Sequence, residues 1–166
     1  MYEFAPADTG DKAALYADLR LAAVAIVEGE RDAIANMANV AALIWQFLPD
    51  LNWAGFYRLI AHDEASELVL GPFQGKAACI RIPVGQGVCG TAAAMRQTQC
   101  IADVHAFPGH IACDAASASE IVVPLVYEGR LIGVLDLDSP ISARFDEDDA
   151  AGLEALCAGI VPALNG

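Results

Sequence analysis

Positive charge is scarce in this chain of 166 residues. Nine Lys and Arg residues stand against 22 Asp and Glu residues, which gives a formal net charge of -13. A protein that binds phosphate backbones or anionic lipid needs a basic surface. The composition therefore predicts no nucleic-acid partner and no membrane partner.

Long apolar runs are also absent. The longest, such as residues 21–27, fall far short of the roughly 20 residues that a membrane-spanning helix needs. Residues 1–10 include Glu3 and Asp8, where a secretory signal would have basic residues and then an apolar run. We therefore expect a cytoplasmic protein. In that reducing compartment, an odd number of cysteines predicts no static disulfide framework, and any disulfide would be transient.

The hydrophobic pattern indicates the fold class. With 56% hydrophobic residues, the chain is too apolar for disorder and long enough for one core. Helical spacing of apolar residues at both ends and a period of two between them predict an α+β domain. We expect one domain over residues 1–166, with a helical segment at 1–48, a sheet with active-site loops at 52–140, and a C-terminal helix at 146–165. The helices would collect on one face of an antiparallel sheet and leave the other face for a pocket.

Two segments inside the expected sheet differ from ordinary connections. Gly85 and Gly87 lead from an expected strand at 78–82 into a short helix at 88–95, which is typical of a loop built for close approach. Residues 103–119 have no periodicity of their own. Loops of that length inside compact domains are usually functional or disordered.

Three cysteines are candidates for chemistry. Cys89 would begin the helix at 88–95, where the helix dipole and free N–H groups stabilise a thiolate. Cys113 lies in the long loop, where no pattern gives it a packing role. Cys79 alternates with Arg81 on the expected strand, so a cation could favour its thiolate. The residues alone do not decide whether Cys89 or Cys113 attacks, although the helix argument favours Cys89.

Other interpretations of the cysteines and histidines remain open. Cys157, on the apolar stripe of the last helix, and Cys100, in a short strand, are expected to pack as small hydrophobes. His110 and Cys113 are spaced like metal ligands, with His105 and Cys100 nearby, but the chain has no Cys-x-x-Cys pair to support a zinc site. A Cys-His nucleophile pair for acyl transfer is possible on the same residues without a local signature.

Acidic and aromatic residues on the expected strands could form the pocket. Asp136 and Asp138 alternate along one strand and share a face, either solvated or lining a pocket with Glu120. In a pocket, desolvation and mutual repulsion would raise at least one carboxyl pKa and keep a proton for general-acid catalysis, or the acids could hold an ammonium group. Trp53 and Tyr57 also share a strand face, as core or as an aromatic wall.

Five motifs together resemble one family. They are NWAGFY at 52–57, GQGVCG at 85–90, FPGHIACD at 107–114, SEIVVP at 119–124 and LDLDS at 135–139. This set is similar to that of the free methionine-R-sulfoxide reductases, which are single GAF domains. The resemblance implies a six-stranded antiparallel sheet, a homodimer, and a closed pocket in which free L-methionine (R)-sulfoxide is reduced to L-methionine. It implies thioredoxin as reductant and no metal, flavin or nucleotide cofactor.

The resemblance also implies roles for individual residues. By match of position, Cys113 is the nucleophile, Cys89 resolves its sulfenic acid as a disulfide, and Cys79 assists or substitutes. The acids that bind substrate and handle protons, and the aromatic wall, are then Glu120, Asp136, Asp138, Trp53 and Tyr57. Two rival functions remain: a GAF module that only senses a small ligand, and a thiol-based peroxide sensor.

Overall fold

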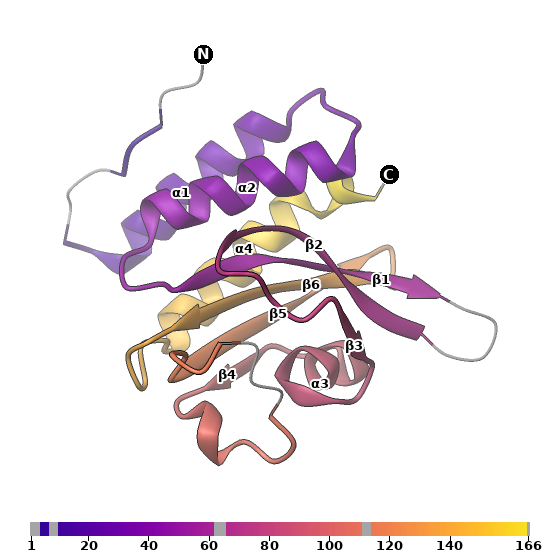
Figure 1. The fold of residues 1–166 in the computed structure, drawn as a ribbon. Coiled ribbons are helices and arrows are strands. Elements are labelled where there is room, and N and C mark those ends of the chain that lie inside the picture. The colour runs from indigo at the N-terminus through magenta and orange to yellow at the C-terminus, as the bar shows by residue number, and fades with distance from the viewer. Residues whose placement is uncertain (1–3, 7–9, 62–65, 111–113, 166) are drawn as a thin grey trace.

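A six-stranded antiparallel sheet forms the centre of the computed structural model, which describes residues 4–6, 10–61, 66–110 and 114–165 (Figure 1). The strand order is β3-β2-β1-β6-β5-β4. The strands are β1 Trp53–Ala61, β2 Ser66–Gly75, β3 Arg81–Pro83, β4 Gln99–Ile101, β5 Ser119–Tyr127 and β6 Arg130–Ser139. The expected hairpin of the two most apolar strands is therefore confirmed as β5 and β6, with β1 beside them.

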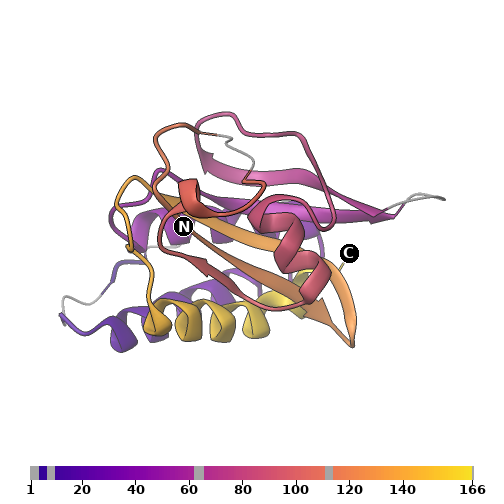
Figure 2. The same ribbon diagram turned by 90° about the horizontal axis from the view of Figure 1, so that it is seen from below.

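The helices divide between the two faces of the sheet (Figures 1 and 2). They are α1 Lys12–Val27, α2 Ala33–Phe47, α3 Gly87–Met95 and α4 Glu147–Ile160, with short 3-10 turns at Val104–Ala106 and Val161–Leu164. As expected, α1, α2 and α4 cover one face, and α3 lies on the other together with the loops that follow it. No helix within the described residues is long and apolar enough to span a membrane.

Side chains alternate between the two faces of the sheet along each strand, and they form a separate hydrophobic core on each face. Phe56, Ile121 and Leu135 point to the large core under α1, α2 and α4. Their neighbours Tyr57 and Val122 point to a second core under α3. Because successive strand residues face opposite sides of a sheet, the pattern that builds the large core also decides which side chains reach the second face.

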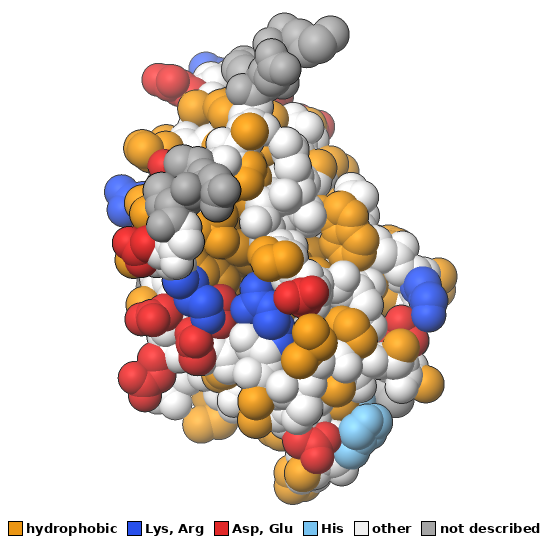
Figure 3. Space-filling model, turned by 90° about the vertical axis from the view of Figure 1, so that its left-hand side faces the viewer, with side chains coloured by type: hydrophobic (Ala, Val, Ile, Leu, Met, Phe, Trp, Pro, Cys, Tyr) orange, Lys and Arg blue, Asp and Glu red, His pale blue; other side chains and the backbone are white. Residues whose placement is uncertain are grey.

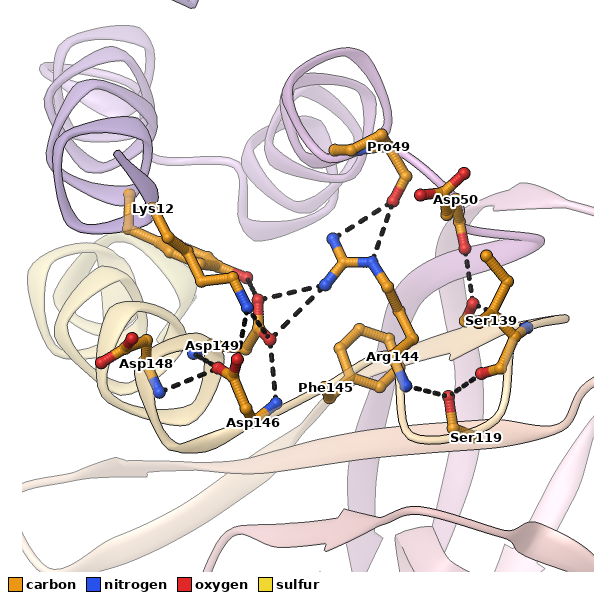
Figure 4. A network of polar contacts seen from close by, with 12 residues as sticks. Lys12, Pro49, Asp50, Ser119, Ser139, Arg144, Phe145, Asp146, Asp148 and Asp149 are labelled. Atoms are coloured by element: carbon orange, nitrogen blue, oxygen red, sulfur yellow. Dashed lines mark hydrogen bonds and ion pairs between the residues drawn. The ribbon is translucent and has the colours of Figure 1, made fainter. Parts of the chain in front are cut away.

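A buried carboxylate connects the helical layer to the loop after β6 (Figure 4). Asp149 of α4 is fully buried and accepts hydrogen bonds from Tyr16 Oη at 2.7 Å and Lys12 Nζ at 2.8 Å, both from α1. Arg144 Nη1 lies 3.3 Å from Asp149 Oδ1. Asp146 caps α4 and also accepts from Lys12. This network fixes the chain where it leaves the acidic strand β6.

Basic side chains do not gather on the face that Figure 3 presents. There the few Lys and Arg side chains lie among acidic ones, so the face carries no continuous basic patch.

One expected strand is wrong in its extent. Residues 78–80 lie outside β3, so Cys79 does not share a strand face with Arg81, which forms an ion pair with Glu67 of β2 instead. Two carbonyl groups of the segment before β3 accept hydrogen bonds from aromatic side chains of β1. Trp53 Nε1 donates to the Lys76 carbonyl at 3.1 Å, and Tyr57 Oη donates to the Cys79 carbonyl at 3.0 Å.

Candidate active site

A small cavity of about 30 Å³ lies on the second face of the sheet. It is bounded by β1, β3, β5 and β6, by the start of α3, by residues 77–78, and by His110, Asp114 and Ser117. The described residues that line it are Trp53, Tyr57, Ala77, Ala78, Ile82, Gly87, Val88, Cys89, His110, Asp114, Ser117, Glu120, Asp136 and Asp138. The sheet therefore brings the predicted acids, the predicted aromatic pair and Cys89 into one site.

Strand register brings the three acids together. Glu120 of β5 pairs with Asp138 of β6, and Val122 pairs with Asp136, so the carboxyl groups share the face that carries Tyr57. Glu120 and Asp136 are each only 6% exposed. The pocket interpretation of these acids is therefore confirmed over the solvated one.

Burial changes the acidity of this cluster. Desolvation, followed by the charges of neighbouring acids, raises the pKa of Glu120 and of Asp136 well above their usual range. Desolvation also raises the pKa of Asp138 to about 7, against a lowering by its hydrogen bond with Ser117. The predicted raising of a carboxyl pKa is confirmed in direction, and the site can retain a proton near neutral pH.

Cys89 faces these acids from the first turn of α3. Gly87 has a φ of +61°, and a Cβ on Gly90 would lie 2.4 Å from the Pro83 carbonyl, so this turn needs glycine at both positions. The Cys89 thiol donates to Glu120 Oε1 at 3.9 Å. Burial, together with Asp136 and Glu120, raises the pKa of the Cys89 thiol. The expectation that the helix dipole makes Cys89 a ready thiolate is therefore wrong, because desolvation and two carboxylates outweigh it.

The aromatic pair lines one side of the cavity. The rings of Trp53 and Tyr57 stack with centroids 5.8 Å apart, and Phe73 stacks on Trp53 at 5.3 Å. Trp53 and Tyr57 are 3% and 1% exposed, so both interpretations hold: each ring belongs to the second core and also lines the cavity.

Comparison with known proteins identifies the family. A model of the GAF domain matches residues 20–165. The free methionine-R-sulfoxide reductase of Escherichia coli is 54% identical over 93% of this chain and 91% of its own length. The chain belongs to the free methionine-R-sulfoxide reductase family. The enzyme of that name from Saccharomyces cerevisiae is 43% identical over 88% of this chain and 83% of its own length. The structure of the Neisseria meningitidis enzyme in complex with its substrate has a TM-score of 0.92 at 45% identity, covering 99% of this chain and 96% of that one.

In this member of the family the cysteines occupy different environments. Cys79 is disulfide-bonded, whereas Cys89, Cys100 and Cys157 carry free thiols. Cys113, the expected nucleophile, lies outside the described residues. Cys157 is buried in the large core as expected, but Cys100 is exposed, so its predicted packing role is wrong. Cys100 sits on β4, which is one of the two edge strands of the sheet, and its thiol donates to the Phe145 carbonyl at 3.5 Å.

Three further polar residues that line the cavity were not assigned to a pocket from the sequence. His110 Nε2 lies 3.8 Å from Glu120 Oε2, and desolvation lowers the His110 pKa. Ser117 is buried and accepts from Asn52 Nδ2 at 3.1 Å. Asp114 accepts from the backbone N–H of Ala116 at 2.9 Å, the main cause of its lowered pKa. An Asp that bonds the N–H two residues later is typical of a turn, and this signal was present in the long loop.

Proposed function

We propose that this protein reduces free L-methionine (R)-sulfoxide to L-methionine. The observation that carries the proposal is the cluster of Glu120, Asp136 and Asp138, buried beneath the Trp53–Tyr57 pair in a chain so similar to curated reductases. Buried carboxylates, with no Lys or Arg among the described residues that line the cavity, suit a ligand that brings its own positive charge.

The substrate's ammonium group pairs with the acids in this proposal, and its methyl sulfoxide end lies against Trp53 and Tyr57. Glu120 and Asp136 hold the ammonium, and Asp138, with its pKa of about 7, exchanges the proton. The cavity holds about two water molecules, so substrate binding displaces some of the side chains that line it.

The chemistry uses the Cys113 thiolate as nucleophile. Its sulfur attacks the sulfoxide sulfur while an acid of the cluster protonates the sulfoxide oxygen. The oxygen transfers to Cys113, which becomes a sulfenic acid, and methionine leaves. A second thiol then condenses with the sulfenic acid, forming a disulfide and releasing water.

We assign the second thiol to Cys79 and no longer to Cys89. Cys79 is the described cysteine engaged in a disulfide, and Cys89 is a free, buried thiol with a raised pKa. A thiol that holds its proton is a poor nucleophile toward sulfur. Cys89 then serves as a hydrogen-bond donor to Glu120.

An external dithiol completes the cycle in this scheme. Thioredoxin reduces the disulfide by exchange, at the expense of NADPH. A reducing cytoplasm supplies such a dithiol, and we propose that compartment and a homodimer for this protein, following the resemblance to the family.

The decisive experiment measures NADPH consumption with thioredoxin, thioredoxin reductase and each epimer of free methionine sulfoxide. We expect turnover with the R epimer and essentially none with the S epimer. Consumption with hydrogen peroxide but with neither epimer would instead support a peroxide sensor. Binding of the sulfoxide, seen as a thermal shift, without turnover would support a non-catalytic GAF sensor.

A further inference from the structure

Three potential metal ligands converge in the cavity. Cys89 Sγ, a carboxylate oxygen of Glu120 and one of Asp136 lie within 4.8 Å of one another. All three residues are at most 6% exposed. Across the parts of the chain that the structure describes, no other group of His, Cys, Asp and Glu meets this spacing. It is also a different set from His110 and Cys113, with His105 and Cys100 nearby, which the sequence offered as zinc ligands.

One oxygen of this group has no partner. Asp136 Oδ1 is buried and makes no hydrogen bond within the described residues. Asp136 lines the cavity, so this unpaired acceptor faces the enclosed space. Buried polar atoms in folded proteins are nearly always satisfied, so an unpaired carboxylate oxygen at a cavity points to a cationic ligand.

We propose that a zinc ion binds to Cys89, Glu120 and Asp136 and thereby blocks the reductase site. Zinc accepts sulfur and carboxylate ligands in a tetrahedral arrangement, with Zn–S near 2.3 Å and Zn–O near 2.1 Å, which separates S from O by about 3.6 Å. The Cys89 Sγ to Glu120 Oε1 distance is 3.9 Å, so this pair needs to close by only a few tenths of an ångström, and the Asp136 oxygen lies within 4.8 Å of both.

A water molecule fills the fourth position, because no fourth His, Cys, Asp or Glu among the described residues joins the group. The cavity of about 30 Å³ has space for an ion and a water without displacing a lining side chain.

The ligand set selects among metals. A thiolate excludes Mg²⁺ and Ca²⁺, which take oxygen ligands, and favours zinc. When zinc binds, Cys89 releases its thiol proton to solvent, and the Zn–S bond replaces the S–H bond. Glu120 and Asp136 release any carboxyl proton they hold in the same way, so the complex places the two positive charges of zinc among one thiolate and two carboxylates.

The inhibitory consequence rests on the proposed function, whereas zinc binding does not. In the proposed reaction Glu120 and Asp136 hold the substrate's ammonium group, so zinc and substrate compete for the same oxygens. Zinc should therefore raise the KM for free methionine-R-sulfoxide and leave kcat unchanged.

Cobalt(II), a spectroscopic substitute for zinc, tests the binding. The full chain, with its disulfide intact and without added thiol, is titrated with Co²⁺. We expect one ion per chain, a near-ultraviolet thiolate-to-cobalt band, and visible bands of tetrahedral intensity, all removed by Zn²⁺ but not by Mg²⁺. Cys89→Ser should abolish the thiolate band, and Asp136→Asn should weaken binding by more than about tenfold. Cys100→Ser, which removes an exposed free thiol, is the matched control and should bind like the wild type.

Three results would overturn the proposal. They are no thiolate band in the wild type, a band that survives Cys89→Ser, and a band that Cys100→Ser removes. Circular dichroism checks the fold of each variant, and Asp136→Asn tests the site by itself if Cys89→Ser does not fold. Competition is measured separately as the rate of methionine release in one turnover at several substrate concentrations, without a reductant because dithiols bind zinc; zinc should raise the half-saturating concentration and leave the limiting rate unchanged. Cobalt binding with no methionine release would refute the proposed function and leave the metal site standing.

Discussion

Glu120 and Asp138 are paired opposite each other across β5 and β6, with both side chains lining one enclosed cavity. Like charges directly opposite each other on one sheet face destabilise a sheet, and burial adds a desolvation cost to each. Asp136 adds a third carboxyl to the same face. Such an arrangement is typical of a functional site, and it makes the proton content of the cluster depend on pH near neutrality.

The pH dependence of turnover should follow Asp138. Its pKa is raised to about 7, so the protonated fraction falls as pH increases through 7. If Asp138 supplies the proton to the leaving oxygen, the wild-type rate declines above pH 7. Asp138→Asn should lower kcat by about 10²-fold or more and remove this decline. Asp148→Asn, an exposed acid outside the site, should keep the wild-type profile, and a decline that persists in Asp138→Asn would assign the proton to another group.

Stability should also respond to pH through Glu120. Its pKa is higher in the folded protein than in the unfolded chain, so at pH values between the two the folded state binds more protons. The free energy of unfolding therefore falls as pH rises above about 4.3, the ordinary Glu pKa. Glu120→Gln removes this group, so its free energy of unfolding should fall less than that of the wild type between pH 5 and pH 8. Urea unfolding at both pH values measures the difference, and equal pH slopes would contradict it.

Single-turnover experiments separate the thiols. Cys113→Ser should release no methionine, because a serine hydroxyl without a strong base is a poor nucleophile. Cys79→Ser should release about one methionine per chain, since the sulfenic acid forms before a second thiol is needed, and then stall with thioredoxin. Cys89→Ser should still form the disulfide and cycle.

The control for this series is Cys100→Ser, which should cycle at the wild-type rate because its thiol is exposed and outside the cavity. Mass spectrometry after one turnover identifies the bridge. A bridge that contains Cys89 in the wild type, or a stalled Cys89→Ser variant, would return the resolving role to Cys89.

Substrate selectivity should favour the free amino acid. N-acetyl-methionine sulfoxide amide lacks the ammonium group, so it would leave the buried carboxylates unpaired and add groups that the small cavity cannot hold. We expect kcat/KM to fall by about 10³-fold or more for this analogue. Comparable turnover of free methionine sulfoxide and this analogue would show that the buried acids do not recognise the substrate's ammonium group.

Asp149 should be among the residues most important for stability. Asp149→Ala leaves Lys12 and Arg144 without their buried partner and Tyr16 without its acceptor, at a cost of about 2–4 kcal/mol in urea unfolding. Asp148→Ala, one residue earlier in the same helix and exposed, should cost less than about 1 kcal/mol. If both variants lose a similar free energy of unfolding, the effect of Asp149 would be that of any acid near the N-terminus of a helix, and the hydrogen-bond network would contribute little.

The sequence was sufficient for features set by periodicity. Alternation along β6 predicted that Asp136 and Asp138 share a face, and that face lines the cavity. Predictions from local spacing were wrong where contacts with residues distant in the sequence determine the environment of a side chain. The helix dipole at Cys89 was visible in the sequence, but Glu120 and Asp136 come from strands more than 30 residues away. Cys100 was expected to pack as a small hydrophobe in a short strand, but the order of the strands, which hydrophobic periodicity does not reveal, places that strand at an edge of the sheet.

Two hydrogen bonds attach the loop that carries Cys79 to the aromatic side chains of the cavity: Trp53 donates to the Lys76 carbonyl, and Tyr57 donates to the Cys79 carbonyl. A substitution that removes either ring therefore changes both the wall of the cavity and the position of the Cys79 sulfur. Tyr57→Phe keeps the ring and deletes only the anchor. We expect this variant to form the disulfide more slowly with an unchanged KM. The difference in rate would measure how far the Tyr57 hydroxyl positions Cys79 for disulfide formation, separately from any contact with the substrate.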